Sequence, residues 1–156
     1  MADWYTEAAE RLRRQECAKQ IIRDHARQET ILLEQEGQRL WKQLRQWLQA
    51  EVKQLNERLG REVLTATVTC RQELDIHAKL ENLERDDSVV FEEATHSVSY
   101  IANNRSTLGE VKSEAWQIKL MPQETVAFCK PNSPNGACQP IEKVSSIILN
   151  GLMGWN

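Results

Sequence analysis

The fold is decided at residues 61–80, REVLTATVTCRQELDIHAKL, where the spacing of the apolar residues changes. Apolar and polar residues alternate here, and only Gln72 breaks the apolar row. The row consists of Leu64, Ala66, Val68, Cys70, Leu74, Ile76, Ala78 and Leu80. A period of two puts every second side chain on the same face of a strand, so one face is dry and the other wet. The pattern predicts one long half-buried strand, or two collinear pieces with a bulge near Gln72.

Residues 1–60, which precede this stretch, are expected to be helical. They contain no proline and only two glycines, Gly37 and Gly60, and they are dense in strong helix formers. Asp3 is a suitable N-cap, and Gly60 lies where a left-handed residue would end the helix. Gly37 is the most favourable place for a break. A continuous two-stranded coiled coil over this whole region is not favoured, because the apolar spacing does not follow strict heptads.

Between residues 40 and 59 the apolar residues recur at steps of three and four. This spacing draws one broad stripe along a helix, which indicates packing on a large apolar surface. We therefore predict that this helix lies across the dry face of the sheet. The predicted contacts join Trp47, Leu48, Val52 and Leu55 to Val68, Leu74, Ile76, Trp116 and Ile148.

The chain after residue 80 predicts further strands and a closing helix. Clusters of turn-forming residues predict turns at 85–88, 103–106 and 122–124. The strands between them cover residues 89–102, 108–121 and 125–130. After a loop at residues 130–136, Pro140 begins a helix whose apolar stripe is Ile141, Val144, Ile148 and Leu152. The predicted fold is α+β, with a long N-terminal helical region, a four-stranded antiparallel β-meander and a C-terminal helix packed on the sheet.

Length and composition indicate one domain with an appendage. The chain has 156 residues, of which 40% are hydrophobic and 28% charged, as in ordinary globular proteins. The first residues lack the apolar segment of a signal peptide, and no apolar run is long enough for a membrane span. Four cysteines without a C-x-x-C pair favour reduced thiols over a disulfide framework or a zinc site. We therefore expect a cytoplasmic protein without a transmembrane segment.

The charge distribution does not favour a polyanionic partner. The net charge is −3, divided into +1 for residues 1–60 (11 basic, 10 acidic) and −4 for residues 61–156 (9 basic, 13 acidic). Lys19, Arg23 and Arg27 form a basic row on one helix face, which can meet phosphates or an anionic membrane. Acidic residues such as Glu16 and Asp24 interleave with this row and dilute its field. We therefore expect neither nucleic acid nor a peripheral membrane surface as the partner.

A histidine, His77, lies between carboxylates on the polar face of the strand predicted at residues 64–80. The same face carries Glu73, Asp75 and Lys79. A histidine in this setting can act as an oriented base or a metal ligand. His96 can come next to His77 if the following strand pairs in a suitable register, which would assemble a metal site. We favour a solvated strand face of mixed charge, and we expect no catalytic residue, metal ligand or cofactor here.

Cys129 and Cys138 flank the proline-rich loop and can face one another across it. A redox-sensing disulfide needs a reactive thiolate with a basic neighbour, which Lys130 offers weakly. We favour two small buried apolar side chains, which is how unpaired cysteines commonly behave. No serine lies in a nucleophile motif, and no glycine-rich phosphate loop precedes a helix, so the sequence indicates a protein that is not an enzyme.

Residues 1–36 are predicted to be a helical interaction arm, and residues 37–156 an α+β domain. Polar residues interrupt the apolar stripe of the arm, among them Gln15, His25 and Glu29, so the arm gains little from packing on its own sheet. Its large apolar side chains are costly to leave in water and should contact a second copy or another protein. The predicted partner-binding residues are Trp4, Leu12, Ile21, Ile22, Ile31, Leu32 and Leu33.

The sequence leaves two functions open. The first is an assembly or adaptor protein, whose helical arm pairs with itself in a homo-oligomer or with a partner helix in a short coiled coil. The alternative is a small-ligand-binding or catalytic roll, with a pocket between the sheet and the long helix near His96, Tyr100 and Trp116. The first is preferred, because the chemically useful residues are few and unclustered, whereas the incompletely filled helical stripe is long.

Overall fold

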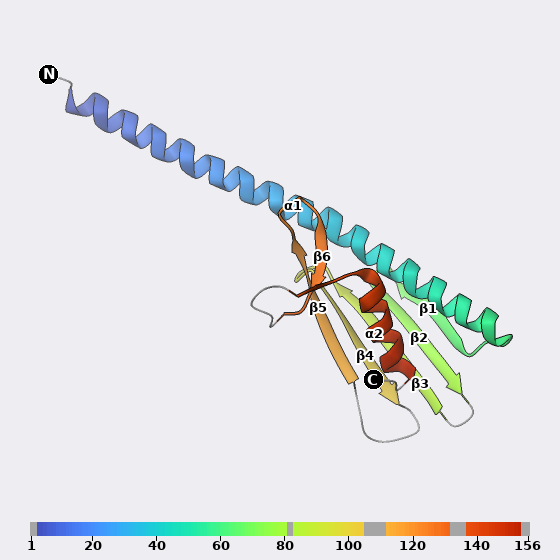
Figure 1. Cartoon of the computed structure of the whole chain (residues 1–156). Helices are drawn as coiled ribbons and strands as arrows, with labels where there is room; N and C mark the ends of the chain where they lie inside the picture. Colours follow the sequence, from blue (N-terminus) through green and yellow to red (C-terminus); the bar gives the residue numbers. More distant parts are fainter. Residues whose placement is uncertain (1–2, 81–82, 105–111, 132–136, 154–156) are drawn as a thin grey trace.

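The architecture is α+β, as predicted, with one antiparallel sheet and two helices that pack on it (Figure 1). A computed structural model describes residues 3–80, 83–104, 112–131 and 137–153. In chain order the elements are α1 (Trp4–Leu59), β1 (Leu64–Cys70), β2 (Glu73–Leu80), β3 (Leu83–Glu92), β4 (Ser97–Asn104), β5 (Lys112–Leu120), β6 (Val126–Cys129), β7 (Cys138–Gln139) and α2 (Ile141–Met153). Each strand pairs with the next along the chain, so the sheet is a meander of seven strands, not the four predicted.

The N-terminal region is a single helix that begins and ends where the capping residues predict. The side chain of Asp3 accepts a hydrogen bond from the Tyr5 N–H, and Gly60 ends the helix with a φ of 66°. The predicted break at Gly37 is wrong, because α1 runs through it without interruption. Gly37 is buried where the helix meets the sheet, beside His96 and Ile118. The packing of the adjacent turns outweighs the cost of one glycine, about 1 kcal/mol.

The stretch predicted as one long strand is a hairpin. The chain reverses at Arg71 and Gln72, so that β1 and β2 lie side by side. From Leu64 to Val68, even-numbered residues of β1 pair with even-numbered residues of β2, as Val68 does with Leu74, and a bulge then pairs Cys70 with Glu73. The alternation therefore continues in phase through the reversal, and the pattern cannot distinguish a hairpin from a straight strand.

The strand predicted at residues 89–102 belongs to two strands, β3 and β4, and the turn predicted before it at residues 85–88 is not a turn. Residues 85–88, predicted as a turn, belong to β3. The reversal falls at residues 93–96, where His96 has a left-handed backbone with a φ of 49°. Within β3, Asp86 contacts His77 of the neighbouring strand, and Arg85 donates a hydrogen bond to the Gly151 carbonyl of α2. Residues 105–106 of the predicted turn at 103–106 lie outside the described residues.

The C-terminal part follows the predicted order. The turn at residues 122–124 joins β5 to β6, as predicted. A short strand that the apolar pattern does not predict, β7, then pairs with β6. The carbonyl of Pro140 accepts a hydrogen bond from the Val144 N–H, and α2 begins at the next residue, Ile141. Residues 132–136 of the predicted loop lie outside the described residues.

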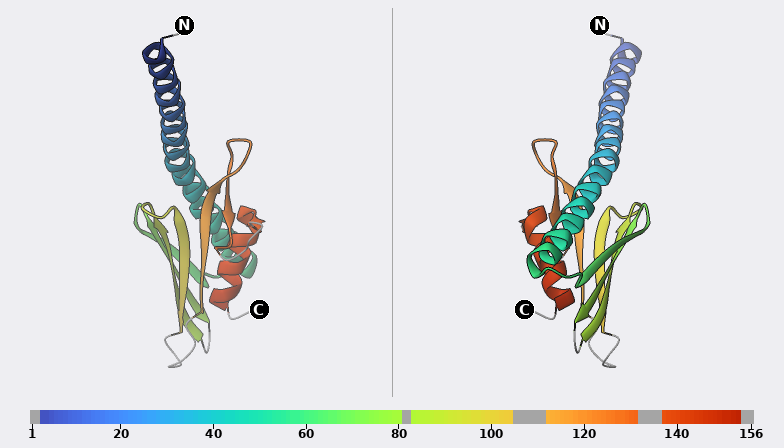
Figure 2. Two further views of the ribbon diagram at one scale, coloured as in Figure 1. Left: turned by 90° about the vertical axis from the view of Figure 1, so that its left-hand side faces the viewer. Right: turned by 90° about the vertical axis from the view of Figure 1, so that its right-hand side faces the viewer.

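The core lies between the sheet and both helices, which cover the same face of it; the other face is uncovered (Figure 2). The C-terminal part of α1 contributes Leu44 and Leu48, and α2 contributes Val144, Ile148 and Leu152, all buried. The sheet contributes Leu74, Ile76, Val89, Val98, Trp116, Ile118 and Phe128. Leu48, Val52, Leu74, Ile76, Trp116 and Ile148 are therefore buried as predicted.

Two of the predicted core residues are exposed instead. Trp47 remains 39% exposed because it lies at the edge of the stripe, beside a groove between α1 and α2. Val68 remains 43% exposed because β1 is an edge strand in which Leu64 alone is fully buried. Leu55 is only partly buried, at the margin of the core.

Candidate functional site

The N-terminal half of α1 projects away from the domain as an extended arm (Figures 1 and 2). All buried residues of α1 lie at Gly37 or beyond it, and every residue from 10 to 31 is exposed. At a rise of about 1.5 Å per residue, the projecting part is about 40 Å long. The predicted arm ends at residue 36, and the first buried residue of α1 is Gly37.

Five of the seven predicted partner-binding residues are exposed on this arm. They are Trp4, Leu12, Ile21, Ile22 and Ile31, and Trp4 and Ile22 have exposed fractions of 71% and 68%. The other two, Leu32 and Leu33, are half-buried at the base of the arm. Leu33 packs against the core, and Leu32 lines a hollow of about 370 Å³ beside the β5–β6 turn.

Tyr5 belongs to the same surface but was not among the predicted residues. Its ring is 75% exposed, and it meets the ring of Trp4 edge to face at 5.3 Å. The signal was present in the sequence, because two adjacent aromatic residues directly follow the N-cap. The tip of the arm therefore carries a pair of exposed aromatic rings, a residue type enriched at protein interfaces.

The polar surface of the arm is mixed in charge. His25 Nδ1 lies 3.4 Å from Glu29 Oε1, and the Gln20 side-chain amide donates to Asp24 at 3.0 Å. These pairs are one helical turn apart, so each stabilises the exposed helix by a few tenths of a kcal/mol at most. The arm thus alternates charged groups of both signs with isolated apolar side chains.

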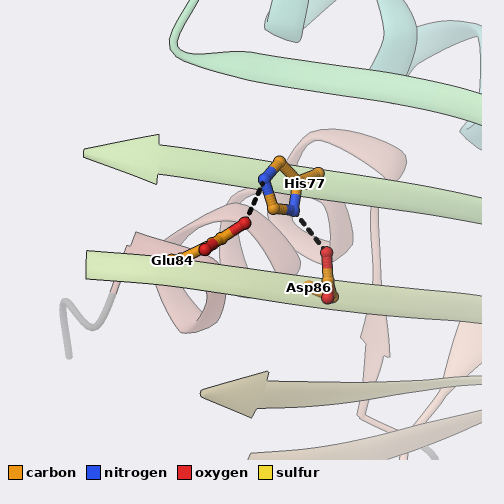
Figure 3. A network of polar contacts seen from close by, with 3 residues as sticks. All are labelled: His77, Glu84 and Asp86. Carbon is orange, nitrogen blue, oxygen red and sulfur yellow. Dashed lines mark hydrogen bonds and ion pairs between the residues drawn. The ribbon is translucent and has the colours of Figure 1, made fainter. Parts of the chain in front are cut away.

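His77 forms a polar network on the uncovered face of the sheet (Figure 3). Its Nδ1 lies 2.5 Å from Asp86 Oδ1, and its Nε2 lies 3.3 Å from Glu84 Oε1. Both partners come from β3, where Asp86 is the register partner of His77. Sequence reasoning missed them because it placed residue 86 in a turn. Both ring nitrogens are already engaged, which leaves neither one available for a ligand.

The other residues singled out on this face have separate partners. Asp75 accepts a hydrogen bond from Thr69 at 2.7 Å, and Glu73 accepts one from Ser88 at 2.8 Å. His96 lies in the β3–β4 turn, next to Gly37, and does not meet His77. Among the described residues there is no group of three or more side chains that could hold a metal ion.

A buried polar cluster lies under α2, on the covered face. Asp87 is buried, and neither of its carboxyl oxygens has a hydrogen-bond partner among the described residues. Burial raises its pKa to about 8, although the charge of Arg85 opposes the rise. Arg85 donates to the carbonyls of Gly151 and Leu152 at 3.3 and 3.5 Å, which anchors the end of α2.

Of the residues expected to line a ligand pocket, His96 borders a hollow of about 230 Å³ between α1 and the β3–β4 turn, whereas the other two lie in the core. Tyr100 and Trp116 are buried, and their rings stack 6.0 Å apart. Burial raises the pKa of Tyr100 to about 12, with the charges of Glu114 and Asp87 adding to the shift. A Cβ atom at Gly151 would lie 2.6 Å from the Tyr100 hydroxyl, so α2 rests directly on this ring.

A hollow of about 290 Å³ lies instead between α1 and the β1–β2 turn. Its rim carries four cationic side chains, Arg39, Lys42, Arg45 and Arg71, and one carboxylate, Glu93. The carbonyl of Arg71 accepts hydrogen bonds from Trp41 Nε1 at 2.9 Å and from Arg45 Nη1 at 3.1 Å. These bonds fix the turn against the helix, so the wall of the hollow is held in place.

The two cysteines that flank the loop meet in the structure. Cys129 in β6 is buried and Cys138 in β7 is exposed, and their Sγ atoms lie 2.7 Å apart. The expected burial therefore holds for one of the two.

Comparison of the chain with protein-family models, with curated proteins and with solved structures gives no match. In the part of the chain that the structure describes, neither helix combines the length and the apolar character that a membrane crossing requires. Function must therefore be argued from the surfaces described above.

Proposed function

We propose that this protein is an assembly or adaptor protein that binds a second copy or a partner helix through the arm of α1. The observation that carries the proposal is the exposure of every residue from 10 to 31 in a helix that bears large apolar side chains. An isolated helical segment of this kind gains most of its stability from packing, which the domain does not supply here. The reduced cysteines fit a cytoplasmic setting.

The expected association is moderate in strength. Full burial of a large apolar side chain contributes about 1.5–3 kcal/mol, so Trp4, Leu12, Ile21 and Ile22 contribute at most about 6–12 kcal/mol per chain, or about 12–24 kcal/mol for two copies. The loss of translational and rotational freedom on association costs about 4–15 kcal/mol. Because this cost offsets a large part of the gain, self-association through the arm should depend on protein concentration.

Light scattering over a range of concentrations tests the proposal. The double substitution Leu12→Ala and Ile22→Ala removes apolar side chains but keeps a strong helix former at both positions. Arg13→Ala with Gln20→Ala is the matched control, since both residues are polar, exposed and on the side of the same helix opposite Trp4 and Ile22. We expect the mass of the parent and of the control to rise with concentration, and that of the apolar variant to stay at one chain.

The arm can also bind a helix of another protein, and hydrogen exchange tests this form of the proposal. In that case the parent is a monomer, and a purified partner protects its arm from hydrogen exchange. The apolar substitutions should abolish this protection. A monomeric parent that needs residues 1–28 in order to fold contradicts both forms, because the arm would then be part of the core.

The hollow at the β1–β2 turn supports a second candidate, a small anionic ligand. Four cations face one carboxylate around a volume close to the lower limit of small-molecule sites. Inorganic phosphate and nucleotides should raise the melting temperature of the parent, and Lys42→Ala should reduce that shift. Lys53→Ala, an exposed change elsewhere on α1, is the control.

A further inference from the structure

Two thiols lie in contact where β6 pairs with β7. Cys129 and Cys138 are register partners in the last pair of strands, and their sulfur atoms lie 2.7 Å apart. Directly opposed residues of an antiparallel pair have Cα atoms about 4.5–5.5 Å apart, which is within the range that a disulfide spans. No backbone movement of another element is needed to join them.

The two thiols differ in exposure, and this difference determines which of them an oxidant reaches first. Cys138 is exposed, so an oxidant in solution can reach it. Cys129 is buried, and burial raises its pKa to about 11, helped by the hydrogen bond with Cys138. Cys129 is therefore protected from direct oxidation but lies in contact with the sulfur that is oxidised first.

We propose that Cys129 and Cys138 are an oxidisable dithiol that forms a reversible disulfide when the protein meets hydrogen peroxide. The Cys138 thiol loses its proton, the resulting thiolate attacks one peroxide oxygen, and the O–O bond breaks. A sulfenic acid forms, and the leaving hydroxide takes up the released proton to give water. The Cys129 sulfur then attacks the Cys138 sulfur, and the sulfenic oxygen leaves as water with the Cys129 proton. Two thiols and one peroxide give one disulfide and two waters, and an added dithiol reverses the oxidation.

A disulfide between Cys129 and Cys138 would restrict the movement of the N-terminal end of α2. β7 is two residues long, and α2 begins at Ile141, directly after Pro140. β6 is anchored in the core through Phe128, which is fully buried. A covalent link between Cys129 and Cys138 therefore ties the N-terminal end of α2 to the core, and it also restricts the unfolded chain. The oxidised protein should melt at a higher temperature than the reduced protein. This inference does not depend on the function proposed for the arm.

The test uses the full chain with Cys17→Ser and Cys70→Ser, which replace the other two cysteines at exposed positions. The folded protein is treated with hydrogen peroxide, its remaining thiols are alkylated, and its intact mass is measured. We expect a product that has lost the mass of two hydrogens and takes up no alkylating reagent. After treatment with dithiothreitol, two thiols should be alkylated, and the melting temperature should return to that of the reduced protein.

Two comparisons make the result decisive. Cys129→Ser should leave Cys138 to accumulate as sulfenic or sulfinic acid, and peptide mapping of the unsubstituted chain should find the bond between residues 129 and 138. A sulfinic acid on Cys138 with Cys129 still a thiol in the two-cysteine protein would overturn the proposal. Disulfide formation that is equally fast in the urea-unfolded chain would also overturn it, because the fold would then contribute nothing.

Discussion

Replacement of Asp87 by asparagine should remove a large pH dependence of stability. Burial raises the pKa of this carboxyl from 3.8 to about 8 in the folded protein. Below both pKa values the carboxyl is protonated in the folded and unfolded states, so its ionisation does not change the free energy of unfolding. Between them the folded protein keeps a proton that the unfolded chain has lost, so stability falls as the pH rises. At about 1.4 kcal/mol per pH unit, the loss between pH 5 and pH 8 is about 4 kcal/mol.

The assay is urea unfolding at pH 5 and at pH 8, followed by the fluorescence of the buried Trp41 and Trp116. Other titrating groups are present in both proteins and cancel in the difference between the variant and the parent. We expect Asp87→Asn to gain about 4 kcal/mol on the parent over this pH range. Glu7→Gln, on the exposed arm, reports the general effect of losing one carboxylate. A difference between Asp87→Asn and its parent that is equal at both pH values would refute the reasoning.

Three further predictions concern packing. Leu48→Ala should cost about 2–5 kcal/mol in the free energy of unfolding, whereas Leu59→Ala, at an exposed position, should cost far less; equal urea midpoints would contradict the core described here. Gly151→Ala should cost about 1–3 kcal/mol because of the Tyr100 ring, and Tyr100→Phe should lower that cost in a double-mutant cycle, since it removes the nearest atom. Deletion of residues 1–28 should leave a domain that melts cooperatively in calorimetry, and a chain without a transition would contradict the boundary.

The periodicity of the sequence predicted most of the buried face, but not where the strands reverse. Leu40, Leu44, Leu48 and Val52 of the helical stripe and Leu64, Leu74, Ile76 and Ala78 of the alternation are buried, whereas Trp47, Leu59 and Val68 are exposed. The reversal at residues 71–72 is hidden because the register keeps the alternation in phase. Residues 85–88 look like a turn by composition, and they form a strand because Arg85 reaches the end of α2, which is far away in the sequence.

The candidate sites were predictable to the extent that they depend on a single element. The exposed residues of the arm follow from one helical pattern, so five of the seven could be located on the projecting part of α1. The approach of Cys129 to Cys138 was foreseen as a possibility from their places on either side of one short loop. The partners of His77, by contrast, depend on the pairing of β2 with β3. Strand register is decided by tertiary packing, so these neighbours could not be read from local sequence.

The spacing of residues along α1 explains how one helix can serve both the core and an external partner. Trp4, Ile22 and Leu40 follow one another at intervals of 18 residues, which is about five full turns, so they lie along one line of the helix. Leu40 is buried on the sheet, while Trp4 and Ile22 point the same way beyond it. Ile21 and Leu32 form a second line about 100° away, and Leu32 meets the β5–β6 turn at the base of the arm.

The two lines together make a broad and sparsely filled apolar face. A two-stranded coiled coil covers a narrower seam, so a single partner helix would leave either Ile21 or Ile22 in water. Further along α1, the sheet and α2 together cover the apolar face of the helix. A second copy or a partner helix can therefore bind along one of the two lines, and a partner that covers both must present a surface wider than one helix, such as the arms of two other chains.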